Sequence, residues 1–214
     1  GFQEVLSPKK QTILLEEFIK DPIKNYISTP SGKIEIFSET IEGFNYKDCP
    51  GHPIWLEQDE WLGSSLAKQY PLQLISGQPN NRLHSQLDNG CESQKDKISG
   101  REAIKIHPQD ALKKKKKNGD IVEIFNKRGK CLAGVIVSKE VMQGVIFLPV
   151  GAWYDPIDDG GYCVHGNPNV LTADIGTSSL SQGPSAHSTL VEVKKFVKEL
   201  PPINIFQKPI IVNK

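Results

Sequence analysis

The sequence lacks closely spaced cysteines. Its four cysteines, Cys49, Cys91, Cys131 and Cys163, lie about forty residues apart, and no CxxC pair occurs. Zinc and iron–sulfur sites need closely spaced ligands on at least one side of the site, so this spacing argues against both. We therefore expect free thiols with structural roles, although the spacing leaves room for one disulfide.

The sequence also lacks an excess of charge of one sign. Lys and Arg number 26, Asp and Glu number 25, and the formal net charge is +1. Aromatic residues interleaved with basic ones are missing as well, so nothing favours a nucleic-acid partner. The five lysines at 113–117 are expected to form a solvated face near a helix C-terminus, where the helix dipole favours positive charge.

Long hydrophobic runs are absent too. No window approaches the roughly 18 apolar residues of a membrane span, and the first residues show no signal-peptide pattern. We therefore expect no membrane partner. Because the chain begins at Gly1 without Met, we expect it to be an excised piece whose targeting sequence, if any, lies upstream.

The first 62 residues indicate a lead-in segment to a larger domain. Ile13, Leu14, Phe18 and Ile19 form an apolar stripe that predicts a helix within residues 1–26. Residues 33–38 alternate apolar and polar side chains, which predicts a half-buried strand. Residues 45–60 are rich in Pro, Gly and Trp and indicate an irregular connector, with Trp55 and Trp61 as surface anchors.

The rest of the chain is patterned for β-structure. Strands are predicted at 72–75, 121–126, 131–138, 144–150 and 189–196. The second and third of these form a hairpin around the turn at 127–130, with Val122 and Ile124 on one face. A helix is predicted within 107–120, and residues 91–100 are predicted to be polar and flexible. Many short strands with few short helices favour a closed β-barrel.

The loop that follows the first of these strands carries a dense set of polar groups. Gly77 allows close backbone approach to a ligand, and the residues after it offer mostly uncharged hydrogen-bonding side chains. These side chains are Gln78, Asn80, Asn81, Arg82, His84, Ser85 and Gln86. They suit a large polar ligand with ring edges and phosphates. A proton-transfer site is not indicated, because the loop holds no pair of carboxylates.

Four segments identify a family. They read GQPNNRLHSQLD, GDIVEIFNKRGKCLAGVIV, GAWYDP and HGNPNVLTADIGTSSLSQG. Together they closely resemble the C-terminal part of the molybdopterin oxidoreductases, the dimethyl sulfoxide reductase family. The nearest match is the branch that reduces S-oxides and N-oxides, namely the biotin sulfoxide, dimethyl sulfoxide and trimethylamine N-oxide reductases. TPSGKIEIFSE and DCPGHPIW resemble the segment that leads into this domain.

The resemblance implies a fold and a domain division. It implies a mainly β fold with short helices, a six-stranded double-psi β-barrel preceded by an irregular lead-in segment. Residues 1–62 are then the lead-in segment from the preceding domain, 63–200 the molybdopterin dinucleotide-binding barrel, and 201–214 a C-terminal tail.

The resemblance also implies a cofactor and a reaction. The cofactor is molybdenum bis(molybdopterin guanine dinucleotide), held between this domain and upstream domains of the same polypeptide. An upstream serine binds the metal, so no catalytic or metal-ligating residue is expected here and the chain alone should be inactive. The substrate class is a small S-oxide or N-oxide, and an electron donor protein is implied. The resemblance favours the periplasm, although biotin sulfoxide reductase is cytoplasmic.

Candidate cofactor contacts follow from the motifs and the resemblance. Backbone at Gly77 and Gly151 can approach flat rings, side-chain amides can pair with guanine or pterin edges, and Arg82 can bind a phosphate. A carboxylate, Asp155 or Asp174, can accept from an amino-pyrimidine edge. The full set comprises Gly77, Gln78, Arg82, His84, Ser85, Gln86, Gly151, Trp153, Tyr154, Asp155, His165, Asn167, Asn169, Asp174 and Gln182.

Other interpretations remain open. Asn167 and Asn169 are ordinary loop residues that can cap a neighbour, and Trp153 and Tyr154 can belong to the core. The barrel can also be a non-catalytic binding module, or a domain of a related molybdenum or tungsten enzyme such as a formate dehydrogenase or nitrate reductase. The pairing of RLHSQLDNG with GAWYDP favours the oxide reductases.

Overall fold

The structure, a computed structural model, describes residues 13–157 and 162–208. The chain divides into two compact units, Gly1–Leu56 and Glu57–Lys214. Within the described ranges, no helix is both long enough and apolar enough to cross a membrane.

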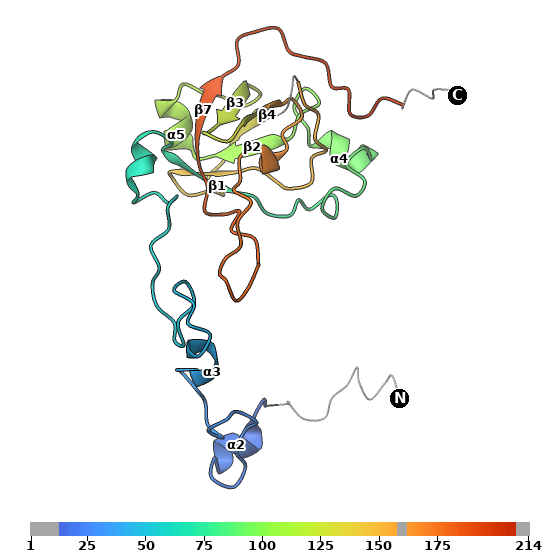
Figure 1. The fold of residues 1–214 in the computed structure, drawn as a ribbon. Helices are drawn as coiled ribbons and strands as arrows, with labels where there is room; N and C mark the ends of the chain where they lie inside the picture. Colours follow the sequence, from blue (N-terminus) through green and yellow to red (C-terminus); the bar gives the residue numbers. More distant parts are fainter. Residues whose placement is uncertain (1–12, 158–161, 209–214) are drawn as a thin grey trace, which may run out of the picture. The chain divides into compact units, whose positions relative to one another are not determined.

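The elements are drawn in Figure 1. In chain order they are α2 (Glu16–Lys20), α3 (Glu39–Glu42), η1 (Ser65–Lys68), β1 (Leu72–Ile75), α4 (Cys91–Lys95), β2 (Ala103–Ile106), α5 (Pro108–Lys113), β3 (Ile121–Phe125), β4 (Lys130–Val137), β5 (Val145–Phe147), β6 (Tyr162–Cys163), η2 (Pro168–Val170) and β7 (Leu190–Lys195).

The first unit holds α2 and α3. A helix was predicted within residues 1–26, and residues 1–12 lie outside the described residues. From residue 13 on it is confirmed only over α2, which Ile13 and Leu14 precede as exposed residues. The predicted strand at 33–38 is wrong: these residues adopt bends and coil, and Ile34 and Ile36 are 69% and 80% exposed. A strand needs a neighbour for its hydrogen-bond ladder, and the described part of this unit contains no other strand.

The second unit is a closed barrel. Strands follow the order β2-β5-β1-β7-β3-β4, and a further β2–β4 pairing closes this ring of six. β1–β5 and β2–β4 are parallel, and the remaining pairs of the ring are antiparallel. The two-residue β6 pairs with β4 outside the ring. The predicted fold class, a mainly β barrel of six strands with short helices, is confirmed.

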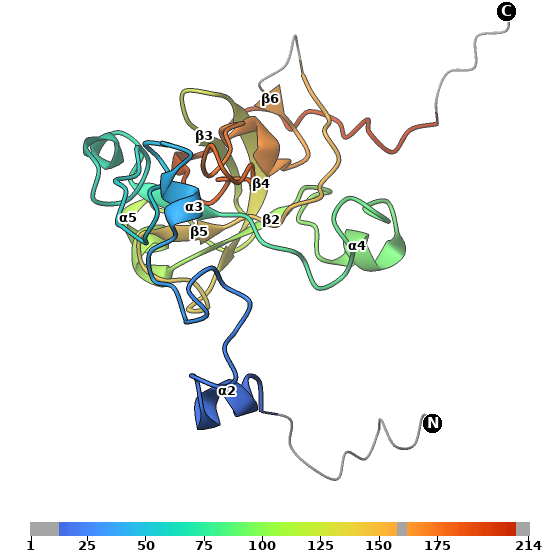
Figure 2. The ribbon, with the colours of Figure 1, turned by 60° about the horizontal axis from the view of Figure 1, so that its bottom comes forward.

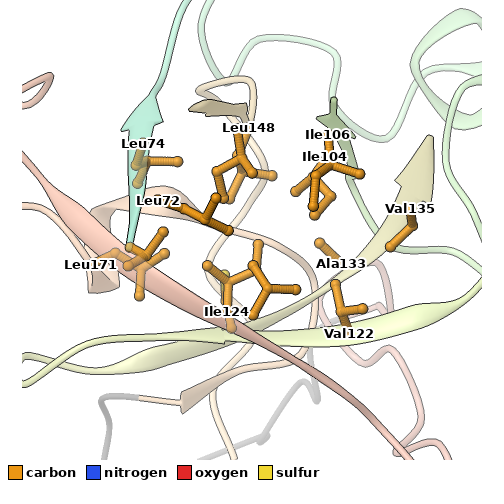
Figure 3. Close-up of a cluster of buried hydrophobic side chains, with 14 of the residues drawn as sticks. Leu72, Leu74, Ile104, Ile106, Val122, Ile124, Ala133, Val135, Leu148 and Leu171 are labelled. Atoms are coloured by element: carbon orange, nitrogen blue, oxygen red, sulfur yellow. The ribbon is translucent and has the colours of Figure 1, made fainter. Parts of the chain in front are cut away.

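Alternating side chains build the core of the barrel. Leu72 and Leu74 of β1 and Ile104 and Ile106 of β2 point into one cluster, where each is at most 2% exposed. Figure 3 shows Leu148, Leu171 and Ile124 filling the same interior from other elements. Burying each such side chain contributes about 1.5–3 kcal/mol. The barrel interior is therefore a packed core, so ligand groups must be sought on the connecting loops.

The hairpin is confirmed in detail. β3 and β4 pair with Ile121 opposite Gly134 and Phe125 opposite Lys130. Val122 and Ile124 are fully buried inside the barrel, whereas Ile121 belongs to a second cluster with Leu132 and Val164. A Cβ on Gly134 would lie 2.3 Å from Cβ of Ile98, so a segment crosses closely over β4. The strands predicted at 72–75, 144–150 and 189–196 correspond to β1, β5 and β7.

Sequence patterns missed several elements. β2 and β6 were not predicted, and the stretch at 91–100, predicted to be flexible, contains α4 and a turn closed by Ile98 and Arg101. The helix predicted within 107–120 ends at Lys113, because Lys115 takes a left-handed φ of 54°. Lys114 of the lysine run pairs with Glu192 of β7.

The cysteines are all free thiols. Cys131 and Cys163 are fully buried and face each other in the β4–β6 register. Burial raises the pKa of the Cys131 thiol well above its ordinary value, and the neighbouring Cys163 raises it further. Both side chains therefore act as small apolar groups in the core.

Truncation of the core should unfold the barrel. We expect Ile104→Ala to lower the free energy of unfolding by about 2–5 kcal/mol, because a fully buried side chain leaves a cavity. Leu112→Ala in α5 is the control: Leu112 is 74% exposed, and its truncation should change the value by less than about 0.5 kcal/mol. Urea unfolding measures both, and equal effects would contradict the assigned core.

Candidate functional site

Two loops that carry the sequence motifs touch each other. Gly151 has a φ of 93°, a conformation that favours glycine. A Cβ at this position would lie 1.8 Å from the carbonyl oxygen of His84. The loop after β5 and the loop after β1 are therefore in backbone contact. The close approach predicted for Gly151 occurs here against the chain's own backbone.

Trp153 joins the same two loops through two hydrogen bonds and contacts the segment after β6 through a third. Its backbone N–H donates to Oδ2 of Asp88 at 2.9 Å, and its indole Nε1–H donates to the carbonyl of Ser85 at 2.7 Å. Its own carbonyl lies 3.0 Å from Nδ1 of His165. Each of these three polar groups of Trp153 bonds to a different residue of the motifs. Trp153 is therefore neither a purely apolar core residue nor a surface residue without partners.

His165 is held neutral. A carbonyl only accepts hydrogen bonds, so Nδ1 carries the proton and Nε2 is the bare acceptor. Burial lowers the pKa of His165 and the charge of Lys97 lowers it further, against the opposing effects of Trp153 and Asp88. Nε2 is buried without a hydrogen-bond partner among the described residues. Such an atom is a mark of an incomplete polar site.

Beneath the loops lies a buried charge cluster of Arg82, Asp88, Lys97 and Glu102. Arg82 Nη2 donates to Glu102 at 2.7 Å, and Lys97 Nζ lies 2.8 Å from Asp88 and 3.1 Å from Glu102. The four side chains are between 0% and 5% exposed. Two cations balance two carboxylates, which is the condition under which buried charges are tolerated.

The cluster fixes the position of each loop. Arg82 Nη2 also donates to the carbonyl of Val150 at 2.8 Å, and Nη1 donates to Ser93 at 3.1 Å. Burial alone would raise the pKa of Asp88, but hydrogen bonds from Lys97 and from the Trp153 N–H hold it below its ordinary value. Asp88 therefore stays ionised and retains both partners at neutral pH.

Sequence reasoning did not find this cluster beyond Arg82. Asp88, Lys97 and Glu102 lie in irregular segments or at the first residues before β2, where no periodicity marks a buried side chain. Arg82 was predicted to bind a phosphate. Its guanidinium is engaged inside the protein, and the phosphate contact stays a prediction.

The exposed part of the first loop carries the remaining polar groups. His84, Ser85 and Gln86 are exposed, and Gln78 contacts His84 twice. Gln78 Nε2 lies 2.7 Å from His84 Nδ1, while Gln78 Oε1 accepts from the His84 N–H at 3.1 Å. A pocket of about 550 Å³ adjoins Gln78, with Lys95, Lys105 and Phe147 in its wall. Gly77 faces the same ring, since a Cβ there would lie 3.0 Å from Phe147.

The other predicted residues occupy η2 and the loop before β7. Asn167 caps η2, accepting from the Asn169 N–H at 2.8 Å, as in the ordinary loop interpretation. Gln182 donates to the carbonyl of Ser178 at 3.0 Å, and Asp174 is exposed. Their loop borders a second pocket of about 610 Å³, whose wall includes Arg128. Arg128 donates to Glu60 at 2.8 Å, which anchors that wall to the start of the unit.

Tyr154 and Asp155 differ in exposure. Tyr154 is 41% exposed, whereas Asp155 is 4% exposed. Oδ2 of Asp155 accepts from the backbone N–H groups of Asn204 and Ile205. The structure therefore gathers Gly77 to Gln86, Gly151, Trp153 and His165 into one group, and it turns Asp155 towards the C-terminal tail. The roles of all fifteen residues in ligand binding stay predictions.

Removing one cation from the buried charge cluster should destabilise the fold. Lys97→Met leaves two buried carboxylates with one cation, and we expect a loss of about 3–5 kcal/mol in the free energy of unfolding. Lys95→Met is the matched control, because Lys95 is 66% exposed and its bridge to Glu92 is a surface pair worth at most about 1 kcal/mol. Urea unfolding at neutral pH compares them, and similar losses would contradict the cluster.

The buried neutral His165 should give a pH dependence. Its folded pKa lies below the ordinary value of 6.5, so the unfolded chain takes up the proton first as the pH falls. The free energy of unfolding should therefore be highest above pH 6.5 and decrease as the pH falls through the folded pKa. Urea unfolding between about pH 5 and pH 7 measures this slope. His165→Gln should flatten it, whereas His52→Gln, at an exposed histidine, should not.

Comparisons with known proteins show which family the chain belongs to. Residues 72–190 match the family described as the molydopterin dinucleotide binding domain. The chain is 44% identical over 204 residues to a trimethylamine-N-oxide reductase of Haemophilus influenzae, covering 94% of this chain and 25% of that protein. It is 50% identical over 190 residues to trimethylamine-N-oxide reductase 1 of Escherichia coli K12, covering 85% and 22%.

The chain thus spans about a quarter of the length of these relatives. A solved structure, the acetylene hydratase from Pelobacter acetylenicus, superposes with a TM-score of 0.64 at 21% identity over 80% of this chain and 24% of that one. At this identity the likeness concerns the fold. Since the family match covers more than half of the sequence, the chain belongs to the molydopterin dinucleotide binding domain family.

Proposed function

We propose that the chain is the cofactor-binding domain of a molybdenum oxidoreductase that reduces N-oxides or S-oxides by oxygen-atom transfer. Its cofactor would be bis(molybdopterin guanine dinucleotide). The observation that carries the proposal is the interlocked pair of loops, in which Gly151 touches His84 and Trp153 bonds to Ser85 and Asp88. These contacts hold the loop after β1 from one side, while its side chains His84, Ser85 and Gln86 are exposed to solvent and Gln78 adjoins a pocket.

The residues present fit a guanine or pterin ring. Gln78, which contacts His84, offers donors and acceptors in the wall of a pocket that also holds the aromatic ring of Phe147 and the cations Lys95 and Lys105. Amide and imidazole groups match ring edges, and lysines match phosphates. Two buried polar atoms, Ser76 Oγ and His165 Nε2, have no partner in the described ranges, which is consistent with polar ligand groups nearby.

Two pockets support a cofactor with two nucleotide arms. Their volumes, about 550 and 610 Å³, fall in the range of roughly 300–1,000 Å³ that is usual for small-molecule sites. One adjoins the loop after β1 and the other the loop before β7. We assign one guanine nucleotide to each. In the second pocket Lys127 and Arg128 are the groups that can contact phosphates, although Arg128 is paired with Glu60 and the same wall also holds the carboxylates of Glu57 and Asp59.

When bound, the molybdenum cofactor supplies the redox metal that exchanges an oxygen atom and two electrons with the substrate. This chain's own residues bind and orient the dinucleotide and exclude water from it. The metal-ligating serine and the substrate funnel belong to upstream domains of the same polypeptide, so the chain alone is inactive. In this proposal residues 1–62 lead in from those domains, 63–200 bind the cofactor, and 201–214 form the tail.

Similarity to trimethylamine-N-oxide reductases at 44–50% identity supports the oxide-reductase branch over formate dehydrogenases or nitrate reductases. The proposed substrate is a small N-oxide or S-oxide, the proposed compartment is the periplasm, and the electron donor is a separate protein.

Titration of the 214-residue chain with GMP tests the proposal. We expect amide NMR shifts within residues 77–86 and 173–188, because residues 78–81 line the first pocket and several residues between 173 and 188 line the second. Gln78→Ala should weaken the first set of shifts while leaving the second set unchanged, since Gln78 lies only at the first pocket. Gln143→Ala, at an exposed residue away from both, is the control.

AMP is the control ligand, because its amino group and ring nitrogen present a different hydrogen-bond pattern from the guanine edge. Equal shifts with AMP, or none at millimolar GMP, would count against guanine-nucleotide binding by this chain.

A further inference from the structure

The tail beyond β7 is fastened to the barrel at several points. We call residues Pro201–Phe206 the C-terminal strap. A guanidinium N–H of Arg101 donates to the carbonyl of Pro201. Ile203 packs against the second hydrophobic cluster, beside Leu132 and Val164. In Figure 2 the segment, coloured red, leaves the barrel beside β6. A tail without a role in the fold would fray, whereas this one is ordered by polar and apolar contacts.

Asp155 is the polar anchor of the strap. One carboxylate oxygen, Oδ2, accepts from the Asn204 N–H at 2.7 Å and from the Ile205 N–H at 3.2 Å. The backbone of Asp155 is itself fixed, since its carbonyl accepts from the Val164 N–H at 2.9 Å. Hydrogen bonds to a charged, buried acceptor are among the stronger ones in proteins. The two N–H donors on this one oxygen hold the strap directly against the loop of Gly151 to Asp155.

Phe206 places an aromatic ring over the site residues. Its ring centroid lies 5.0 Å from that of His165 in an edge-on arrangement at 88°, and 5.4 Å from that of Trp153 at 52°. His165 is 0% exposed and Phe206 is one of the groups that cover it. Aromatic pairs prefer such edge-on and tilted arrangements. Through Phe206 the strap therefore packs against His165 and Trp153, the two residues that bond to each other and to the motif loops.

These contacts form one continuous path. Phe206 fixes Trp153, and Trp153 holds the carbonyl of Ser85 and the carboxylate of Asp88. Ser85 and its neighbours Gln78 and His84 form the exposed polar surface. Because each step is a direct contact, loosening the strap releases Trp153 first and the polar loop next.

We propose that the C-terminal strap holds the loop of Gln78 to Gln86 in its ligand-binding conformation, with Asp155 and Phe206 as positioning residues rather than ligand contacts. The ligand part of this inference rests on the proposed function. It changes the role predicted for Asp155: its carboxylate serves two amides of its own chain, which leaves the exposed Asp174 as the acceptor for an amino-pyrimidine edge.

The test compares strap variants of the 214-residue chain by two independent measurements. The first follows hydrogen exchange of the Trp153 N–H and titration of the His165 ring by NMR. The second follows GMP binding at residues 77–86. The variants are Phe206→Ala, Asp155→Ala, Asp155→Asn and a chain ended at Leu200. Leu200→Ala is the matched control, because Leu200 is a half-exposed apolar residue next to the strap.

We expect Phe206→Ala, Asp155→Ala and the shortened chain to speed exchange at Trp153 and to raise the pKa of His165 towards its ordinary value. GMP binding should weaken roughly tenfold, because the loop would then adopt its binding conformation in only about one molecule in ten. Asp155→Asn should restore much of the protection, because its side-chain oxygen still accepts both amides. Leu200→Ala should change neither measurement.

Three results would distinguish a positioning role of the strap from a competing role and from a failure of the proposed function. Unchanged exchange and His165 titration in the shortened chain would overturn the positioning role. Tighter GMP binding in the shortened chain would also overturn it, since the strap would then be a competitor for Asp155. Altered exchange and titration in a chain that binds no GMP would support the strap's hold on the loop while contradicting the proposed function of the isolated chain. Asp155→Asn and Phe206→Ala keep the test valid if Asp155→Ala fails to fold.

Discussion

The arrangement of the motif loops depends on the buried pairing of Arg82 and Lys97 with Asp88 and Glu102. Each ion would be costly to bury alone, and the four are tolerated because charge and hydrogen bonds balance locally. The loop after β1 supplies Arg82 and Asp88, while Val150 at the start of the next loop accepts from the same guanidinium. The ion pairs and hydrogen bonds of these four residues therefore hold together loops that lie outside the hydrophobic core of the barrel.

This use of charge explains why an irregular surface can be rigid. Residues 76–90 contain no regular helix or strand beyond one isolated bridge, so backbone hydrogen bonds alone cannot hold them. In place of regular backbone hydrogen bonds, the segment is held by ion pairs, by the hydrogen bond of the Trp153 indole and by the contact of Gly151 with His84. Such side-chain support is what a ligand surface on loops requires, because ordered loops lose less conformational entropy on binding.

The sequence allowed the barrel to be predicted better than the site. The strand Leu72–Ile75 was found as a short apolar run that ends at turn residues, and Ile121–Phe125 was found from the alternation of its side chains. β2 was missed because three of its four residues are buried, which removes the alternation. The alternating residues 33–38 gave a false strand because periodicity does not reveal whether a partner strand exists.

At the site, residue types indicated which loops carry ligand chemistry but not which way a side chain points. Arg82 and Asp155 have the same types as exposed ligand contacts, yet both are buried against partners distant in sequence. Lys97, Glu102 and Phe206 gave no local signal. Lys97 meets its partners only through the irregular fold of its segment, Glu102 meets Arg82 from 20 residues away, and Phe206 meets Trp153 and His165 from the C-terminal strap. The resemblance of several motifs in order identified the family, which single motifs could not.

The position of β7 in the ring has a consequence for biosynthesis. β7 lies between β1 and β3, so the first and last strands of the ring are neighbours. The ring cannot close until residues 190–195 have emerged from the ribosome, and β1 must wait unpaired on that side through more than a hundred residues of synthesis. At about 5–20 residues per second, this leaves one edge of β1 without its partner strand for roughly 6–20 seconds. The hydrogen bonds of that edge form only when β7 arrives.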